Sequence, residues 1–371
     1  MAYCSRSLTI GGFDHVGVLV IGGDAPVAVQ TMWKDRLGPL DLEGEAGEAV
    51  IARIQGLQEM GCGLLRFAVP DLEAAEVLGR LASLVSMPLV ADIHFDYRIA
   101  LRCLDFPIAK IRINPGNIGS RDRVEAVLSK AALKGAPIRI GVNAGSLPQE
   151  LRPLVDRGEI SRAEALVQAA EREIAVCREL GFTNYLVSLK ASSAGETVAA
   201  NRLLAQGLGS GGPPLHVGVT EAGPLVAGTV RNTMALQTLL AEGIGDTIRV
   251  SLSGAMEHEV MAAREILSAM APGPRFQSGG IRIVSCPRCG RNGFDTHSFT
   301  ERWLPRLYRL PRTATVAIMG CVVNGPEEAR HADLGITGAG DKVLIFRHGQ
   351  VTRTIDAAQA DAAFAEELAK L

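Results

Sequence analysis

Short runs of β-branched and aliphatic residues alternate with longer segments in which apolar positions recur every three or four residues. The short runs predict buried strands, and the longer period predicts amphipathic helices. Strands are expected to start near Val27, Leu64, Pro88, Ile108, Pro137, Asn184, Leu215 and Asp246. A helix is expected after each strand, and residues 256–270 supply the one that follows the last strand.

This alternation over about 250 residues is typical of a (β/α)8 barrel, although a doubly wound open sheet also accommodates it. Ahead of the first strand, LTIGG and HVGVLVIGG predict a hairpin that closes the barrel floor. Pro and Gly in APGPRFQSGG interrupt the pattern near residue 272 and predict a linker. The expected organisation is therefore an α/β chain with a substrate-binding TIM-type barrel over residues 1–271.

Residues 272–371 predict a second, small α+β domain. Its expected strands are IRIVS, ATVAIMG, ADLGIT, DKVLIF and QVTRTI. Its expected helices lie near HSFTERWLPRLY and AAQADAAFAEELAKL.

Composition narrows the class of protein. Apolar residues make up 47% of the chain and charged residues 21%, as in a well-packed enzyme. The formal net charge of −2 argues against a nucleic-acid binder that works through bulk positive charge, so any anion site must be local. No N-terminal apolar run is long enough for a signal peptide or a spanning helix, which predicts a cytoplasmic protein with no membrane partner.

Polar side chains close most of the predicted barrel strands, where the active site of such a barrel lies. They are Arg66, Asp92, Arg112, Asn114, Arg139, Asn143, Lys190, Glu221, Arg249, Ser251 and Ser253. Taken singly, each cation equally fits a salt-bridged wall residue. Crowded together in a partly dry mouth, however, unpaired cations are costly, and a phosphate or diphosphate would offset that cost through charge-assisted hydrogen bonds.

Two of the groups near these strand ends can move protons at neutral pH. They are His94, and Glu221 if burial favours its protonated form. Either residue equally fits a role in holding a loop.

Of the seven cysteines, Cys62, Cys103 and Cys177 lie in apolar, helix-like surroundings that favour buried structural thiols, and Cys4 lies near the N-terminus. In a reducing compartment disulfides are not expected, so clustered cysteines become candidates for metal binding or redox chemistry. The remaining three are clustered.

Cys286 and Cys289 form a C-x-x-C pair, and Cys321 follows in MGCVVNGPEEA. An Asn-Gly-Pro turn then allows Glu328 to fold back beside Cys321. Three thiolates suit three irons of a 4Fe-4S cluster, with a carboxylate as a weaker, exchangeable ligand of the fourth iron.

A zinc site remains an alternative, with His297 or His331 completing a tetrahedral set, and so does a redox pair. A closed zinc site needs no cations at the strand ends, and the chain lacks a second C-x-x-C pair beside the first.

Taken in order, the motifs resemble those of the 4-hydroxy-3-methylbut-2-enyl diphosphate (HMBPP) synthase family. The matching strings, which run from residue 21 to residue 329, are IGGDAPVAVQTM, LLRFAVP, ADIHFDYRIAL, KIRINPGNIG, IRIGVNAGSL, SLKASS, HVGVTEAG, GIGDTIRVSLSG, SCPRCGR and GCVVNGPEEA. The resemblance implies an N-terminal (β/α)8 barrel and a C-terminal iron-sulfur domain.

The resemblance also implies a reaction. It is the two-electron reductive ring opening and dehydration of 2-C-methyl-D-erythritol 2,4-cyclodiphosphate to HMBPP, in the methylerythritol phosphate route to isoprenoids. Electrons would come singly from reduced flavodoxin or ferredoxin through a 4Fe-4S cluster bound by Cys286, Cys289, Cys321 and Glu328. A head-to-tail homodimer would join the barrel of one subunit to the cluster domain of the other.

Individual roles follow from the same resemblance. Glu221 would be the acid-base carboxylate, and Asn324 would stand beside the apical iron. The diphosphate would be held by Arg66, Arg112, Arg139, Lys190, Ser251 and Ser253.

Two stretches depart from the family pattern. The usual GPGE is GPEE here, which places Glu327 where glycine is expected and gives Glu328 a carboxylate neighbour. After QTM, a Thr-rich stretch is replaced by WKDRLGPLD, which leaves the loop after the first barrel strand without a role. A divergent iron-sulfur reductase of another diphosphate and a non-catalytic metal-binding module therefore stand as alternatives.

Overall fold

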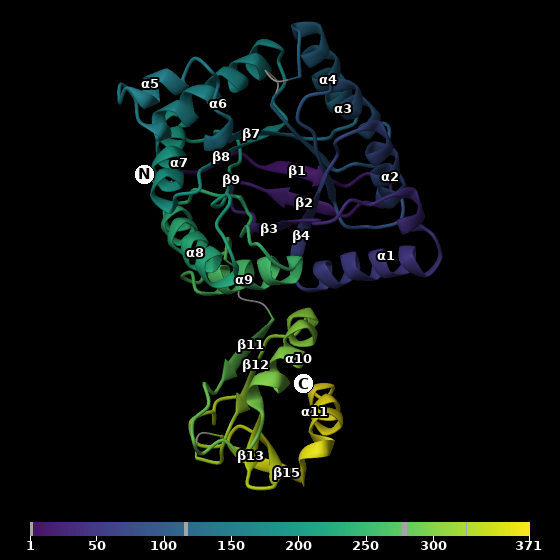
Figure 1. Ribbon diagram of the computed structural model, residues 1–371, viewed down its shortest axis with the longest axis vertical. Coiled ribbons are helices and arrows are strands. Elements are labelled where there is room, and N and C mark those ends of the chain that lie inside the picture. The colour runs from purple at the N-terminus through teal and green to yellow at the C-terminus, as the bar shows by residue number, and fades with distance from the viewer. Residues whose placement is uncertain (1–2, 115–117, 277–279, 324) are drawn as a thin grey trace. The chain divides into compact units, whose positions relative to one another are not determined.

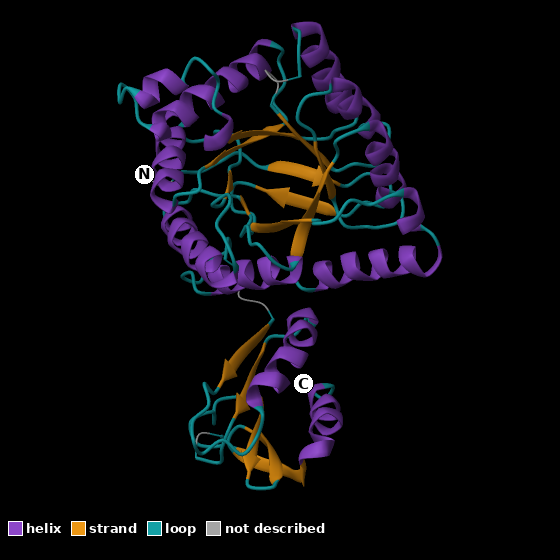
Figure 2. Cartoon of the chain, viewed as in Figure 1, coloured by secondary structure: helices purple, strands orange, loops and turns teal. Residues whose placement is uncertain are grey.

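The computed structural model describes residues 3–114, 118–276, 280–323 and 325–371 (Figures 1 and 2). Contacts divide the chain into two compact units, Met1–Gln277 and Ser278–Leu371. Each unit is built on its own main sheet. Arg275, within the predicted linker, donates hydrogen bonds to Gly243 O at 2.8 Å and Gly245 O at 2.6 Å, so the chain up to this point is fastened to the first unit.

The first unit is a parallel eight-stranded sheet in the order β8-β7-β6-β5-β4-β3-β10-β9. Its strands are β3 (Ala28–Met32), β4 (Cys62–Ala68), β5 (Leu89–Asp92), β6 (Lys110–Ile113), β7 (Ile138–Asn143), β8 (Tyr185–Lys190), β9 (His216–Val217) and β10 (Thr247–Ile248). A parallel bridge between Val187 and Leu215 joins β8 to the start of β9, and Val187 N donates to Pro214 O at 3.0 Å. The sheet therefore closes on itself, which confirms the predicted barrel and excludes the open sheet.

Helices surround this barrel, as Figure 2 shows. They are α1 (Gly44–Glu59), α2 (Leu72–Ala82), α3 (Tyr97–Cys103), α4 (Arg121–Leu133), α6 (Arg162–Glu179), α7 (Ala194–Leu208), α8 (Leu225–Ala241) and α9 (Met256–Ser268), with the shorter α5 (Arg152–Asp156), η1 (Pro39–Leu42) and η3 (Ala144–Ser146) in loops. Local capping fixes several of their starts. Ser161 and Glu164 form a capping box on α6, and Asp71 accepts from Ala74 N at 2.8 Å on α2.

An antiparallel hairpin of β1 (Leu8–Gly11) and β2 (Val18–Ile21) closes one end of the barrel. Ile10 and Ile21 of the hairpin are fully buried, and they pack with Leu64 and Val90 from the barrel strands. The apolar plug leaves the opposite, carboxyl end of the strands as the open mouth.

The second unit contains a five-stranded sheet in the order β11-β12-β13-β14-β15. Its elements are β11 (Ile281–Ser285), α10 (Thr296–Arg309), β12 (Ala314–Met319), β13 (Leu334–Ala339), β14 (Lys342–Arg347), β15 (Gln350–Asp356), η4 (Ala357–Gln359) and α11 (Ala360–Leu368). Phe299 and Trp303 of α10 pack against Phe364 of α11, with ring centroids 5.2 and 4.8 Å from it. The small α+β architecture is the one predicted.

Three cysteines are plainly structural. Cys62, Cys103 and Cys177 are buried, and burial raises the pKa of each thiol to about 12. Such thiols remain protonated at neutral pH and are poor nucleophiles or ligands. In the described part of the chain, no helix is long and apolar enough to cross a membrane.

Candidate active site

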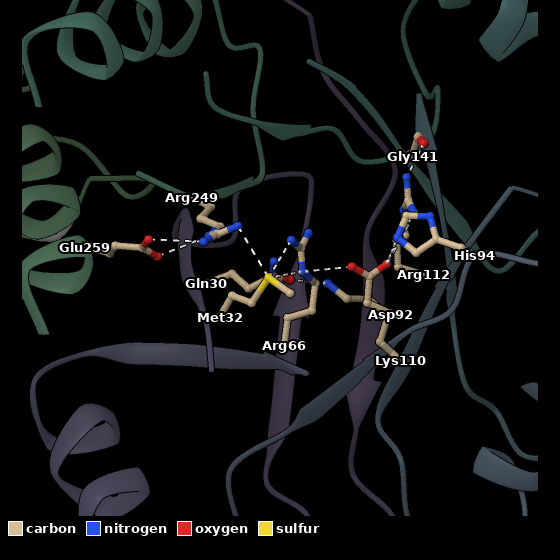
Figure 3. Close-up of polar contacts among 10 residues, drawn as sticks. All are labelled: Gln30, Met32, Arg66, Asp92, His94, Lys110, Arg112, Gly141, Arg249 and Glu259. Atoms are coloured by element: carbon tan, nitrogen blue, oxygen red, sulfur yellow. Dashed lines mark hydrogen bonds and ion pairs between the residues drawn. The ribbon is translucent and has the colours of Figure 1, made fainter. Parts of the chain in front are cut away.

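Asp92, at the carboxyl end of β5, lies between two arginines of the neighbouring strands (Figure 3). Its Oδ2 is 3.5 Å from Arg66 Nε, and its Oδ1 is 3.3 Å from Arg112 Nη1. Burial alone would raise the pKa of Asp92, but Arg66, Arg112 and Arg139 outweigh it and hold the pKa below its usual value. One ionised carboxylate therefore faces several cations at the mouth.

Arg112 is held by the next strand as well as by Asp92. Its Nη2 donates to Gly141 O at 2.7 Å, and Gly141 N donates to Asn114 Oδ1 at 2.9 Å. A β-carbon on Gly141 would lie only 2.6 Å from Arg112 Nε, so a glycine is needed here for space. The sequence predicted Arg112 and Asn114 as site residues but gave no signal for Gly141.

Arg139 and Lys190 are cations of the mouth that have no counter-charge in the described chain. Their exposed fractions are 2% and 5%, and within the described chain neither forms an ion pair. Arg139 Nε and Nη2 are buried without hydrogen-bond partners there. Desolvation, followed by neighbouring arginines, lowers the pKa of both groups well below their usual values, so an anion beside them would favour their charged forms.

Arg249 differs because it is paired. Its Nε and Nη2 each lie 3.1 Å from the carboxylate of Glu259 in the first turn of α9, and this carboxylate is fully buried. Glu259 also accepts from Thr31 Oγ1 at 2.6 Å and from Leu252 N at 3.0 Å. Leu252 separates the predicted phosphate ligands Ser251 and Ser253, so Glu259 fixes that loop. Sequence reasoning missed Glu259, since an acidic residue in a helix first turn is equally typical of an exposed surface.

The loop after β3 contributes to the same network. Lys34 Nζ is 2.5 Å from Glu259 Oε1 and 3.1 Å from Leu252 O. Trp33 stacks on Phe67 with ring centroids 5.6 Å apart. The divergent stretch that the sequence left without a role is thus anchored at the mouth by Lys34.

A cavity of about 480 Å³ opens at this end of the barrel. Among the predicted site residues, its lining includes His94, Arg112, Asn114, Asn143 and Glu221. The remaining predicted barrel residues lie outside that lining, and they are Arg66, Asp92, Arg139, Lys190, Arg249, Ser251 and Ser253. The cavity is large enough for a small phosphorylated molecule.

Glu221 has a left-handed backbone with φ of 51°, which is uncommon for a residue with a side chain. The loop before it is tightly placed, because a β-carbon on Gly218 would lie only 2.2 Å from Arg249 O. Glu221 is exposed, so the burial that the sequence interpretation required for proton transfer is not met by the described chain. Its strained conformation in the cavity wall nevertheless marks it as a candidate functional residue.

His94 lies beside Arg112, with Nδ1 3.1 Å from Arg112 Nη1. Desolvation and the nearby arginines outweigh Asp92 and lower the pKa of His94. The imidazole is therefore neutral at neutral pH and is suited to accept a hydrogen bond or a proton. The sequence alone did not indicate in which direction the pKa of His94 is shifted.

In the second unit, the loops that carry the clustered cysteines lie at one edge of the sheet. β11 and β12 are parallel neighbours, with Ser285 opposite Ile318, and Cys286 N donates to Ile318 O at 3.0 Å. Gly293 N donates to Gly320 O at 2.9 Å, so the loop containing Cys289 folds against the residue before Cys321. A β-carbon on Gly320 would be 3.7 Å from Cys286 Sγ, which places this thiol beside the same turn.

The donor set fits a thiolate-bound cluster in kind and in the placement of its loops. Cys286 is half-buried, Cys289 is exposed and Cys321 is buried, and within the described chain none of the three is in a disulfide. Asn292 Oδ1 is buried beside Gly320 without a hydrogen-bond partner there. Among the described residues, however, no three His, Cys, Asp or Glu side chains converge to metal-binding distance. Glu328 is exposed in the turn after Cys321, and Asn324 lies outside the described residues.

A closed (β/α)8 barrel with buried, uncompensated cations at its mouth is the architecture of a barrel enzyme that binds an anionic small molecule. Comparison with known proteins identifies the family. Residues 14–264 match the GcpE TIM-barrel domain and residues 282–370 match the GcpE protein C-terminal domain, so the chain belongs to the GcpE family.

Two similar proteins carry the same functional name. The 4-hydroxy-3-methylbut-2-en-1-yl diphosphate synthase (flavodoxin) of Treponema pallidum is 52% identical over 385 residues, covering 100% of this chain and 92% of the relative. The protein of the same name from Geobacter sulfurreducens is 44% identical, covering 95% of each chain. These findings confirm the predicted family. The solved dihydropteroate synthase of Thermus thermophilus is 18% identical over 70% of this chain and 96% of its own, with a TM-score of 0.44, which is too distant to inform function.

Proposed function

We propose that this protein is a flavodoxin-dependent HMBPP synthase, which reductively opens 2-C-methyl-D-erythritol 2,4-cyclodiphosphate and releases water. The observation that carries the proposal is the pair of buried cations, Arg139 and Lys190, that the described chain leaves without a counter-charge at the barrel mouth. A buried charge without a partner is costly, and a ligand of opposite charge offsets that cost. A cyclic diphosphate supplies two negative charges.

The diphosphate is held by the cations that have free hydrogen-bonding capacity. Arg139 offers Nε and Nη2, and Lys190 offers its ammonium group beside Gly218. Arg66 and Arg112 share the single carboxylate of Asp92, which leaves their remaining N–H groups for phosphate oxygens. Asn114, Asn143 and the hydroxyls of Ser251 and Ser253 complete the set of neutral donors.

The carbon skeleton then lies in the cavity, between His94 and Glu221. Loss of water requires that a hydroxyl leave with a proton, and the carboxyl of Glu221 is positioned in the wall to supply it. His94 is neutral and bonded to Arg112, so it orients that guanidinium rather than delivering charge. We assign Glu221 as the acid-base residue and His94 as its neutral neighbour.

Cys286, Cys289 and Cys321 would hold three irons of a 4Fe-4S cluster, and Glu328 would hold the fourth. When bound, this cluster passes electrons one at a time to the substrate and offers an exchangeable iron to its oxygen. Asn324 is assigned beside that iron on the resemblance alone. Thiolates are soft and a carboxylate is hard, which makes the fourth position the weakest link and the one open to substrate.

Backbone hydrogen bonds favour Glu328 over Glu327 as that ligand. Gly325 N donates to Cys321 O at 3.0 Å and Ala329 N donates to Gly325 O at 3.1 Å, each with the i to i−4 spacing of a helical turn. With about 3.6 residues per turn, a residue seven positions along returns to the starting face. Glu328 is seven residues after Cys321, whereas Glu327 is six residues after it, so the helical spacing favours Glu328.

The barrel cations and the cysteine loops belong to separate units of the chain. We propose that two chains pair head to tail, so that the barrel of one subunit meets the cluster domain of the other. Reduced flavodoxin is the proposed electron donor, as in the names of the relatives, with ferredoxin as its substitute. We also propose that the protein works in the cytoplasm.

The direct test is anaerobic turnover. Reconstituted protein, reduced flavodoxin and the cyclodiphosphate should give HMBPP by mass spectrometry, and the protein should absorb broadly near 400 nm, roughly as expected of thiolate-bound iron. Protein that binds zinc in the cysteine loops, lacks this absorption and forms no product would overturn the assignment.

A further inference from the structure

Lys110 is a buried lysine that the proposed reaction does not use. It opens β6 and lies two residues before Arg112. Alternate residues of a strand point to the same face, so Lys110 also points into the barrel, one layer below Arg112. Its exposed fraction is 0%, and Figure 3 shows its side chain reaching toward Gln30 beneath the cation cluster.

The surroundings of Lys110 contain no counter-charge in the described chain. Its Nζ donates to the amide oxygen Gln30 Oε1 of β3 at 3.1 Å, and it forms no ion pair there. The charged groups that face it are Arg66 of β4 and Arg139 of β7, both cations. Asp92 of β5, one layer higher, is engaged by Arg66 and Arg112.

His216 of β9 completes this lower layer. It is fully buried, its Nδ1 lies 2.8 Å from Thr247 Oγ1, and its Nε2 is buried without a partner in the described chain. Burial and the nearby cations lower the pKa of His216 well below its usual value. The imidazole is therefore neutral, and it adds no negative charge near Lys110.

We propose that Lys110 is an uncharged amine in the empty barrel and takes up one proton from solvent when the diphosphate binds above it. This inference rests on the proposed function, because it needs an anion at the mouth. The proton adds to the Nζ lone pair and converts the amine to an ammonium group. No other bond changes.

The chemistry of the side chains explains why the proton is exchanged at this residue. Arginines remain protonated even when buried, whereas an amine gives up its proton readily. Lys190 of β8 is a second buried amine of this kind, but it lies at the mouth, whereas Lys110 lies one layer below it. Desolvation, followed by Arg139 and Arg66, lowers the pKa of Lys110 well below its usual value. A bound diphosphate places negative charge beside these arginines. This charge favours the protonated form of the amine and raises the pKa of Lys110.

The pH dependence follows with a definite sign. The pKa of Lys110 is low in the empty barrel and higher in the complex, so proton uptake occurs at pH values between the two. As the pH rises through the pKa of the complex, the affinity for the diphosphate falls, at most about tenfold per pH unit. Below the pKa of the empty barrel, Lys110 is already charged and uptake ceases.

Calorimetry on the anaerobic, unreduced holoenzyme tests the proposal. The cyclodiphosphate is titrated in buffers of different ionisation enthalpy, which reports the protons exchanged on binding. Each phosphorus of a cyclic diphosphate carries one strongly acidic oxygen, so the ligand itself does not titrate near neutral pH. Wild-type protein should take up at least one proton per site near neutral pH. Lys110→Met should lower that uptake by about one proton and reduce the pH dependence of affinity, while the buried amine of Lys190 keeps its own contribution.

Lys34→Met is the matched control. Lys34 Nζ lies 2.5 Å from Glu259 Oε1 and so has the carboxylate partner that Lys110 lacks, and this variant should retain the wild-type uptake. Binding without uptake in the wild type, or unchanged uptake in Lys110→Met, would overturn the inference. Absence of any binding would instead overturn the proposed function, and this inference with it.

A second measurement uses wild-type protein and therefore does not depend on whether a variant folds. In wild-type protein labelled with 13C-lysine, the Cε resonance of Lys110 reports the ionisation of the neighbouring Nζ. It should move from the neutral to the charged position when the cyclodiphosphate is added, while the Lys34 resonance should not move. A Lys110 resonance that is charged before ligand is added contradicts the proposal.

Discussion

Replacing Arg139 by methionine should make the protein more stable and, at the same time, a weaker binder. Only 2% of Arg139 is exposed, and its Nε and Nη2 have no partners in the described chain. Replacing a buried ion pair by apolar side chains of similar volume is often neutral or stabilises a fold by about 1–4 kcal/mol, and a buried charge without a partner is costlier than a pair. For a unit of this size, about 2 kcal/mol corresponds to a rise in melting temperature of roughly 4–8 °C.

The same change removes two charge-assisted hydrogen bonds to the diphosphate. At about 1.5 kcal/mol each, their loss costs roughly 3 kcal/mol of binding energy, or about a 100-fold weaker dissociation constant. Calorimetry in the absence of reductant measures that constant, and differential scanning calorimetry of the ligand-free protein measures stability.

Arg249→Met is the control for this pair of opposite effects. Arg249 is more exposed than Arg139, with 11% of its side chain accessible, and it is paired with the fully buried carboxylate of Glu259. Its removal therefore leaves that carboxylate with less positive charge beside it. This variant should melt at a lower temperature than wild type. If Arg139→Met also melts lower than wild type, Arg139 has a counter-charge in the empty barrel, and the argument that its charge awaits a ligand is refuted.

Three further predictions follow from the same contacts. Gly141→Ala should lower diphosphate affinity by roughly tenfold or more, because the new methyl group occupies the space of Arg112 Nε, and an unchanged dissociation constant would show that Arg112 has room to move. Asp92 and Glu259 have pKa values held below the usual range, so they stabilise the fold above the pKa of the unfolded chain and lose that contribution as pH falls through the folded pKa. Asp92→Asn should therefore flatten the acid side of a plot of melting temperature against pH, and an unaltered acid limb would contradict the assigned ion pairs. Glu328→Gln should perturb the iron absorption of the reconstituted protein and Glu327→Gln should not, whereas equal effects would mean that the helical spacing after Cys321 does not select the ligand.

Much of the fold was predictable because each strand and helix repeats its own period. The barrel strands begin within a few residues of the predicted positions, and the fold class is confirmed by the closing bridge between Val187 and Leu215. The strand ends also indicated which cations would gather, since the carboxyl ends of parallel strands meet at one mouth.

What the sequence could not indicate is which of those cations are paired. Arg249 and Arg139 look alike as strand-end arginines, but Glu259 approaches only Arg249 of the two, from the helix that follows its strand. Gly141 and Lys110 were equally hidden. The first matters because Arg112 crosses above it, and the second because no carboxylate from another strand reaches it in the described chain.

The cysteine motif predicted the type of metal ligand but not the distances between the ligands. Its spacing indicated the chemical type of the donors, and the parallel pairing of β11 with β12 accounts for the neighbouring loops. The spacing carried no information on how far the side chains stand apart, and in the described chain they do not yet converge on one point. The metal ligands therefore stay a prediction.

The most direct measurement is an experimental structure of the holoenzyme with the cyclodiphosphate bound. It should show phosphate oxygens accepting hydrogen bonds from Arg139 Nε and Nη2, the two nitrogens that the described chain leaves without partners. A diphosphate bound elsewhere, with those two nitrogens still unsatisfied, would contradict the central claim that the barrel mouth carries its charge for this ligand.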